Sequence, residues 1–183
     1  MHELPQTLSK AIRFFSNANE CEAYIKKLKW PEGRPVCPEC GLADHIGEIK
    51  SRHLWQCNSI RRFTRGSSKV KERCGKQFSI KTGTVFEDSP LDLPQWLVAV
   101  WCVANDGVNA NISSYELGKA LDVRQKTAWK MFYRIRKTVD LRKFKSTGAD
   151  DKFRKLCMKL VRKQGGKKDD AKKEKESEQQ AKG

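Results

Sequence analysis

The sequence predicts an α+β protein in which a small, metal-stapled β unit lies between an N-terminal helical segment and three C-terminal helices. Three observations support this prediction: Cys, Gly and short β-forming runs gather in residues 34–86, apolar residues recur at helical spacing in 87–141, and apolar residues become sparse after 142. We therefore divide the chain into four segments: 1–33, 34–86, 87–141 and 142–183.

Composition indicates a polyanionic partner. The 183 residues include 38 Lys and Arg against 22 Asp and Glu, which gives a formal net charge of +16. Such a balance favours nucleic acid, because basic side chains neutralise phosphates and release counterions. No apolar run reaches the roughly 18 residues that a membrane-spanning helix needs, and no signal peptide opens the chain. We therefore expect a cytoplasmic protein without a membrane partner.

The first segment predicts a short helical module. Residues at helical spacing follow two candidate N-caps, Ser16 and Asn17; these are Ala18, Cys21, Tyr24, Ile25 and Leu28. The run Trp30-Pro31-Glu32-Gly33 ends the module, because proline and glycine cannot continue a helix without cost.

Four cysteines of the second segment have the pattern of a zinc ribbon: Cys37, Cys40, Cys57 and Cys74. A Cys-x-x-Cys pair followed by Gly41 turns the backbone tightly enough for both thiolates to face one ion, and a second pair completes a tetrahedral shell. We expect one structural Zn²⁺. Two alternatives stay open: the thiols are small buried groups without metal, or His45 or His53 replaces one of them. The remaining cysteines, which we expect to be packed rather than metal-bound, are Cys21, Cys102 and Cys157.

A basic insertion at 59–72 separates Cys57 from Cys74. It can return to the metal if its ends meet, as in a β-hairpin with its turn near Gly66-Ser67-Ser68. Its cations outnumber the single acid, Glu72; they are Arg61, Arg62, Arg65, Lys69, Lys71 and Arg73. We expect a finger that contacts a nucleic-acid backbone through Arg61, Arg62 and Arg65.

The third segment predicts three helices. The turn at residues 89–94 leads into an apolar helix whose core-facing stripe is Trp96, Leu97, Val100, Trp101 and Val103, and Asp106-Gly107 ends it. Ser113 and Glu116 form a capping box for a second helix that ends near Leu121. A tight turn at Asp122-Val123 precedes a third helix, from about Arg124 to Val139, with one apolar face: Ala128, Phe132, Ile135 and Val139.

This arrangement favours a helix-turn-helix domain, in which the third helix offers cations, a glutamine and aromatic edges to the major groove of DNA while its other face packs on the first two helices. The candidate DNA-binding residues on it are Arg124, Gln125, Lys126, Lys130 and Arg134. A three-helix bundle with a solvated basic face is the alternative, and periodicity alone does not separate the two. The Lys- and Glu-rich segment 142–183 is expected to form a largely disordered tail.

Several motifs, in this order, resemble those of insertion-sequence transposases that carry a zinc ribbon, a helix-turn-helix and a ribonuclease-H-like catalytic domain with an Asp-Asp-Glu triad. The resemblance covers about residues 17–140. It rests on residues 30–33, 36–41, 55–57, 74–86, 93–96, 112–114, 126–129 and 134–136. It implies that the ribbon and helix-turn-helix bind double-stranded DNA at transposon ends.

The chain departs from this family in two ways. The insertion splits the second cysteine pair, and no catalytic half follows the third helix. Asp150, Asp151, Asp169 and Asp170 lie in Lys-rich, strand-poor sequence, whereas a two-metal site needs carboxylates on a rigid sheet. We therefore expect a DNA-binding module without transposase chemistry. One alternative is the DNA-recognition subunit of a split transposase, in which a separate chain supplies the catalytic carboxylates. Another is an RNA-binding or scaffolding zinc ribbon in which Trp55 and Phe63 stack on bases. A second copy of the chain, in a homo-oligomer, is a further candidate partner.

Overall fold

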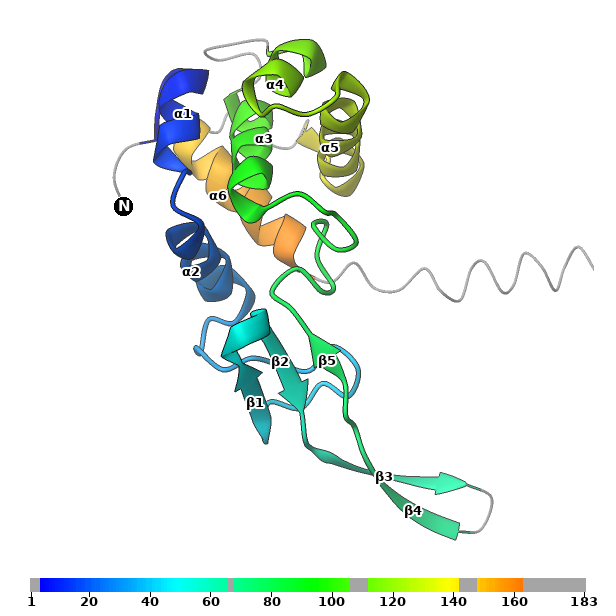
Figure 1. Cartoon of the computed structure of the whole chain (residues 1–183). Coiled ribbons are helices and arrows are strands. Elements are labelled where there is room, and N and C mark those ends of the chain that lie inside the picture. The colour runs from blue at the N-terminus through cyan, green and yellow to red at the C-terminus, as the bar shows by residue number, and fades with distance from the viewer. Residues whose placement is uncertain (1–3, 66–67, 106–111, 142–147, 163–183) are drawn as a thin grey trace, which may run out of the picture.

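The computed structural model describes residues 4–65, 68–105, 112–141 and 148–162. The architecture is α+β, with helices gathered at one end, a small antiparallel sheet beneath them and a two-stranded arm that projects from the sheet (Figure 1). The candidate metal site lies between the sheet and the root of the arm.

Two helices form the N-terminal segment, α1 (Leu8–Phe14) and α2 (Ala18–Lys29). The side-chain oxygen of Asn17 accepts hydrogen bonds from the backbone N–H groups of Asn19 and Glu20, at 3.1 and 3.3 Å, and so caps α2. The helix predicted after Asn17 is therefore confirmed. The sequence predicted one helical module in this segment and did not predict α1 as a separate helix.

The sheet has the order β1-β2-β5, with β1 at Ile46–Ile49, β2 at Leu54–Cys57 and β5 at Gln77–Phe78. A 3-10 turn, η1 (Lys50–Arg52), joins the first two strands. Trp55 lies at the centre of an aromatic cluster, with ring centroids 5.0 Å from Trp30 and 6.2 Å from Phe78. Because Trp55 is buried, it is not free to stack on a base, and that part of the RNA alternative is wrong.

The basic insertion forms an antiparallel hairpin, β3 (Ile60–Arg65) and β4 (Ser68–Arg73), which we call the arm. Its strands pair directly from Ile60↔Arg73 to Arg65↔Ser68. The expected hairpin is thus present, while Gly66 and Ser67 of its predicted turn lie outside the described residues.

Helix α3 (Leu93–Asn105) is the centre of the helical end. It is buried on all sides rather than along a single stripe, because α1, α2, α5 and α6 all pack around it. Trp101 is fully buried, and its indole N–H donates to the carbonyl of Pro5 at 2.9 Å. The predicted helix is confirmed, and its break at Asp106-Gly107 lies outside the described residues.

Helices α4 (Ser114–Ala120) and α5 (Gln125–Thr138) follow and are joined by a short turn. The predicted capping box is present: the Ser113 hydroxyl accepts from the N–H of Glu116, whose carboxylate accepts from the N–H of Ser113. Asp122 adopts a positive φ of 53° in the turn, and the N–H of Val123 donates to the carbonyl of Gly118 at 2.9 Å.

Gly118 lets the two helices approach this closely. A Cβ at this position would lie 2.9 Å from the Val123 carbonyl oxygen and 3.3 Å from the Gln125 Cα. Gly118→Ala is therefore expected to lower the melting temperature, because the clash costs about 1–3 kcal/mol and offsets the roughly 1 kcal/mol that alanine gains as a helix former. Thermal unfolding measures this, and an unchanged or raised melting temperature would contradict the tight turn.

A sixth helix, α6 (Ala149–Val161), corrects the prediction of a disordered tail from residue 142. Its apolar face is buried against α2 and α3, and it consists of Phe153, Leu156, Cys157, Leu160 and Val161. Their spacing is helical, but abundant Lys and Asp in the same stretch hid the signal. The rest of the predicted tail, 163–183, lies outside the described residues.

Four hydrogen bonds connect the helices to residues 80–87, the segment that follows the last strand of the sheet. The Lys29 ammonium donates to the carbonyls of Ile80 and Thr82 at 2.9 and 2.6 Å, and its burial lowers its pKa to about 8. The N–H of Val85 donates to the carbonyl of Leu160 at 3.0 Å. The Arg134 guanidinium donates to the carbonyl of Glu87 at 2.7 Å. Helices α2, α6 and α5 are thus each fixed to residues 80–87.

Candidate metal centre and nucleic-acid interface

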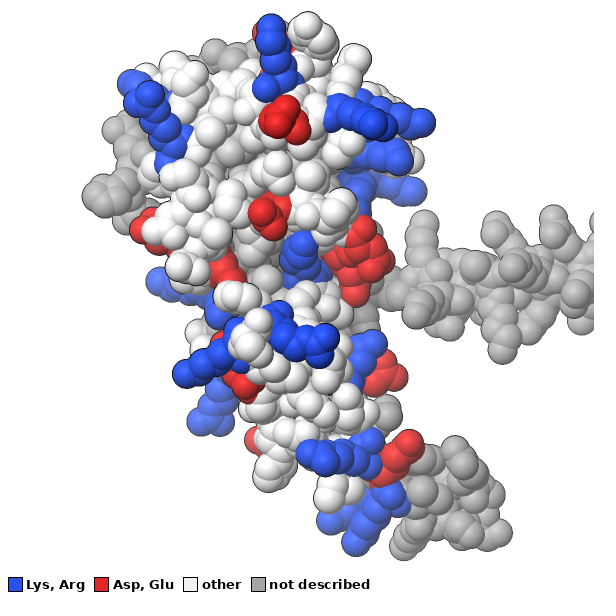
Figure 2. All heavy atoms as spheres, in the orientation of Figure 1, with Lys and Arg blue, Asp and Glu red and all other residues white. Residues whose placement is uncertain are grey.

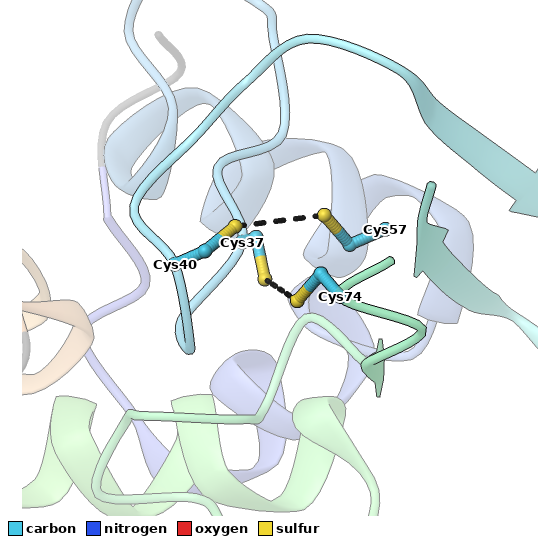
Figure 3. Close-up of side chains that lie close together, drawn as sticks. All are labelled: Cys37, Cys40, Cys57 and Cys74. Atoms are coloured by element: carbon cyan, nitrogen blue, oxygen red, sulfur yellow. Dashed lines mark hydrogen bonds between the residues drawn. The ribbon is translucent and has the colours of Figure 1, made fainter. Parts of the chain in front are cut away.

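The four predicted cysteines converge on one point (Figure 3). All four Sγ atoms lie within 4.8 Å of one another, with Cys37 and Cys74 at 3.7 Å and Cys40 and Cys57 at 3.6 Å. A tetrahedral ion with Zn–S bonds of about 2.3 Å would hold its sulfurs about 3.8 Å apart, whereas a disulfide would require about 2.05 Å. The cluster therefore fits one structural Zn²⁺ bound by four thiolates.

The backbone turns that bring the thiols together depend on glycine. Gly41 and Gly75 follow the second cysteine of each pair, with positive φ values of 72° and 64°. In the first turn, the N–H of Gly41 donates to the carbonyl of Cys37 at 2.9 Å, and the N–H of Cys37 donates to that of Leu42 at 3.0 Å. Cys40-Gly41 and Cys74-Gly75 thus share the same positive-φ glycine, although the arm separates Cys57 from Cys74.

The thiols differ in acidity without an ion. Burial opposes ionisation of Cys57, but contacts with the hydroxyl and backbone N–H of Ser59 lower its pKa to about 7. Burial raises the pKa of Cys40 to about 12, and the neighbouring thiols of Cys37 and Cys57 add to the effect. Because zinc requires thiolates, binding must release protons.

The structure also tests the alternative of a histidine ligand and the expected packing of the three other cysteines. His53 faces Glu22, with its Nδ1 3.7 Å from a carboxylate oxygen, and neither His53 nor His45 joins the metal cluster, so the alternative of a histidine ligand is wrong. The cysteines predicted to be packed are all buried: Cys21, Cys102 and Cys157.

Helix α5 presents a basic face opposite its packed one. The packed face consists of Ala128, Met131, Phe132 and Ile135. Four candidate residues are exposed at its N-terminal half: Arg124, Gln125, Lys126 and Lys130. No acidic residue occurs within Gln125–Thr138, so the charged side chains that the helix itself contributes are all basic.

The sequence predicts aromatic edges on this helix, but the candidate residues named from it did not include the two aromatic side chains that are exposed on this face. Trp129 and Tyr133 are 55% and 50% exposed, and their rings stack with centroids 5.3 Å apart. The Lys137 ammonium lies 5.7 Å from the Tyr133 ring centroid. Their i, i+4 spacing outside the apolar stripe was the available signal, because residues four apart on a helix lie side by side and here would form an exposed aromatic pair.

The other candidate cations have different surroundings. Arg134 is half-buried over the Trp96 ring, 5.4 Å from its centroid, in addition to its bond to Glu87. Arg62 is exposed on the arm, whereas the described structure places Arg61 and Arg65 only by their backbone. Figure 2 shows Lys and Arg atoms at the root of the arm and at the end that carries α5.

The acidic residues considered in the sequence do not gather. Asp150 and Asp151 are exposed in the first turn of α6, and Asp151 pairs with Lys155 at 2.5 Å. Within the described residues, the four cysteines are the one group of three or more His, Cys, Asp or Glu side chains close enough to share an ion. Asp169 and Asp170 lie outside the described residues.

Comparison with known proteins agrees with the metal geometry. A family described as a transposase zinc-ribbon domain matches residues 16–59, a range that includes α2 and three of the four cysteines and ends where the arm begins. No solved structure matches the chain. In the described residues, no helix combines the length and the apolar character needed to cross a bilayer.

A relative from Halobacterium salinarum extends the similarity beyond the ribbon. It is a protein in the transposable element ISH50, 26% identical over 129 residues, and the alignment covers 70% of this chain. The chain spans only 38% of that relative's length. The match with the zinc-ribbon family and this longer alignment lead to one conclusion: the chain resembles the N-terminal, zinc-ribbon-bearing part of insertion-sequence transposases.

Proposed function

We propose that the chain is a zinc-dependent protein that binds double-stranded DNA, related to the DNA-recognition part of a transposase and without its catalytic function. The observation that carries this proposal is the exposed basic face of α5, fixed on its other side by packing to α3 and α4. A short turn before a helix rich in cations is the geometry that places such a helix in a major groove. Transposon ends are the proposed targets, and the cytoplasm is the proposed location.

Two of the four segments have a role in this proposal. The zinc ribbon, 34–86, positions the arm, and 87–141 forms a helix-turn-helix in which α5 is the recognition helix. The proposed contacts of α5 are Arg124, Gln125, Lys126 and Lys130, with Trp129 and Tyr133 beside them. The stacked pair offers an apolar edge that suits thymine methyl groups. Arg134 stays a weaker candidate, because its side chain is half-buried over Trp96 and its guanidinium binds the Glu87 carbonyl.

Substitution of the α5 face tests the proposal. Lys126→Ala with Lys130→Ala is expected to weaken duplex binding and to reduce the slope of log affinity against log salt by about 2, since each lost phosphate contact removes about 0.9. Gln125→Ala is expected to cost roughly 1–3 kcal/mol of discrimination if it reads a base. Fluorescence anisotropy over a salt series measures both effects.

A double variant on other elements serves as the control. Lys10→Ala with Lys27→Ala removes the same charge from exposed positions of α1 and α2. If this pair weakens binding as much as the α5 pair, the loss is a general effect of net charge and α5 is not the recognition helix.

Single-stranded RNA is the second candidate ligand, favoured by the exposed Trp129–Tyr133 stack, because aromatic side chains bind unpaired bases by stacking. Competition between a duplex and single-stranded RNA across the salt series separates the two candidates.

A split transposase, in which another chain supplies the carboxylates, would show strand transfer only after that chain is added. Strand transfer by this chain alone, lost with EDTA and dependent on one of its own carboxylates, would contradict the non-catalytic proposal.

A further inference from the structure

The arm projects from the body of the protein. Its strands pack chiefly on each other, and Figure 1 shows it extending beyond the sheet. An isolated two-stranded hairpin is marginally stable in water. A projecting ribbon of this kind therefore suggests a surface that becomes covered by a partner.

The root of the arm is anchored at the metal cluster. The N–H of Cys74 donates to the carbonyl of Ser59 at 2.9 Å and closes the hairpin directly beside the Cys57 and Cys74 thiols. The Arg73 guanidinium donates to Asn58 across the same root at 2.7 Å. The arm is thus held at its base by backbone pairing and by the two cysteines that flank it.

The register separates the charges of the arm onto two faces. Ile60 pairs with Arg73 and Arg62 pairs with Lys71, so these four residues share one face, because directly opposed residues lie on the same side and neighbours along a strand alternate. All four are exposed, and Ile60 is 62% exposed. Glu72 pairs with Arg61 on the opposite face. The first face, which we call the cationic face, therefore has three described cations and no acid.

The dimensions of the arm suit a DNA groove. A strand of six residues extends about 20 Å at roughly 3.3 Å per residue. A two-stranded ribbon fits the major groove, which is about 12 Å wide. The arm and α5 lie at opposite ends of the molecule (Figure 1), and the contacts of Arg134 and Lys29 fix α5 and α2 to residues 80–87, which follow the last strand of the sheet. The arm and α5 are therefore two separate candidate contact sites.

We propose that the cationic face of the arm, Arg62, Lys71 and Arg73, lies in a groove of the same DNA duplex that α5 contacts, at a second site along it. This inference rests on the proposed DNA-binding function and deepens it. In this arrangement the three cations of the arm contact phosphates and groove edges, and α5 makes a separate contact. Full affinity then requires a duplex long enough to reach both sites.

Duplex length and arm charge together test the inference. The zinc-loaded full chain and the variant Arg62→Ala, Lys71→Ala, Arg73→Ala are compared on random-sequence duplexes of about 10 and about 30 base pairs, which are about one and three helical turns. On the long duplex the variant is expected to bind at least tenfold more weakly, with a salt slope lower by about 2 to 3. On the short duplex, chosen so that it reaches one site, the two proteins are expected to agree within about twofold.

Two further proteins make the result decisive. A control with Lys10, Lys27 and Lys50 replaced by alanine removes the same charge away from the arm. A second variant replaces residues 60–73 with Gly-Gly, which the Ser59–Cys74 closure permits, and its zinc content verifies that the metal site remains. It is expected to match the triple arm variant.

The outcomes separate the inference from the proposed function. If the arm variants and the lysine control lose the same affinity on the long duplex, or if the arm variants lose equally on both lengths, the second site is overturned while DNA binding stands. If the unaltered chain shows no salt-dependent binding to either duplex, the proposed function fails and the inference fails with it.

Discussion

Cys37→Ser is expected to release the zinc ion and to unfold residues 34–86. Cys37 is 1% exposed, and its thiol is one of four that a single ion requires. The three-stranded sheet has short strands and few buried apolar residues, so it lacks a core that could compensate for metal loss. Structural zinc contributes about 10–16 kcal/mol to folding of small zinc domains, and a serine hydroxyl replaces a thiolate poorly.

Metal analysis and near-ultraviolet circular dichroism measure the effect. The unaltered, reductively purified protein is expected to contain about one zinc per chain. Cys21→Ser is the matched control, because Cys21 is also buried but lies outside the cluster, where its thiol contacts the carbonyl of Phe15. Absence of zinc from the unaltered protein, or retention of zinc by Cys37→Ser, would refute the four-thiolate site.

Trp96→Ala is expected to destabilise the helical end by about 3–5 kcal/mol, the usual cost of removing a large aromatic side chain from a core. Trp96 is 1% exposed, and its ring centroid lies 5.4 Å from that of Phe86. Its indole N–H donates to the Ser89 hydroxyl at 3.1 Å, and the Arg134 guanidinium lies over its ring. The substitution therefore opens a cavity where α3, α5 and residues 86–89 meet.

Trp129→Ala provides the matched comparison, because the same change occurs on an exposed part of α5. We expect it to change the free energy of unfolding by less than about 0.5 kcal/mol and to weaken DNA binding. Urea unfolding and duplex titration distinguish the two variants. Stability loss at Trp129 equal to that at Trp96 would mean that the aromatic pair belongs to the core rather than to the binding face.

The metal site and the α4–α5 pair could be predicted from sequence because their signals are local. The cysteine pairs carry their own turn glycines, Gly41 and Gly75, and the Ser113–Glu116 box fixes the start of α4 within four residues. The arm was also predictable, because chain closure at Cys57 and Cys74 leaves few ways to accommodate 59–72. The distribution of its charges between two faces could not be predicted, because it depends on the register of β3 and β4.

Features that depend on tertiary contacts could not be predicted in the same way. Burial of α3 on all sides requires α6, whose apolar stripe is diluted by Lys and Asp. The sequence does not show that Trp55 is covered, because the ring that packs against it belongs to Trp30, the C-cap residue of α2. Arg134 falls within a cation-rich helix, and only the approach of residues 86–89 shows that its guanidinium binds inside the protein.

The position of the cysteines has a mechanical consequence. Cys57 and Cys74 flank the arm, and the other two thiols belong to the turn at Cys37–Cys40, so one bound ion would cross-link both ends of the arm to a separate turn of the body. Removal of the ion by a chelator would break this cross-link and leave the backbone connections of the arm intact. We therefore expect chelation to widen the range of directions in which the arm points relative to the sheet.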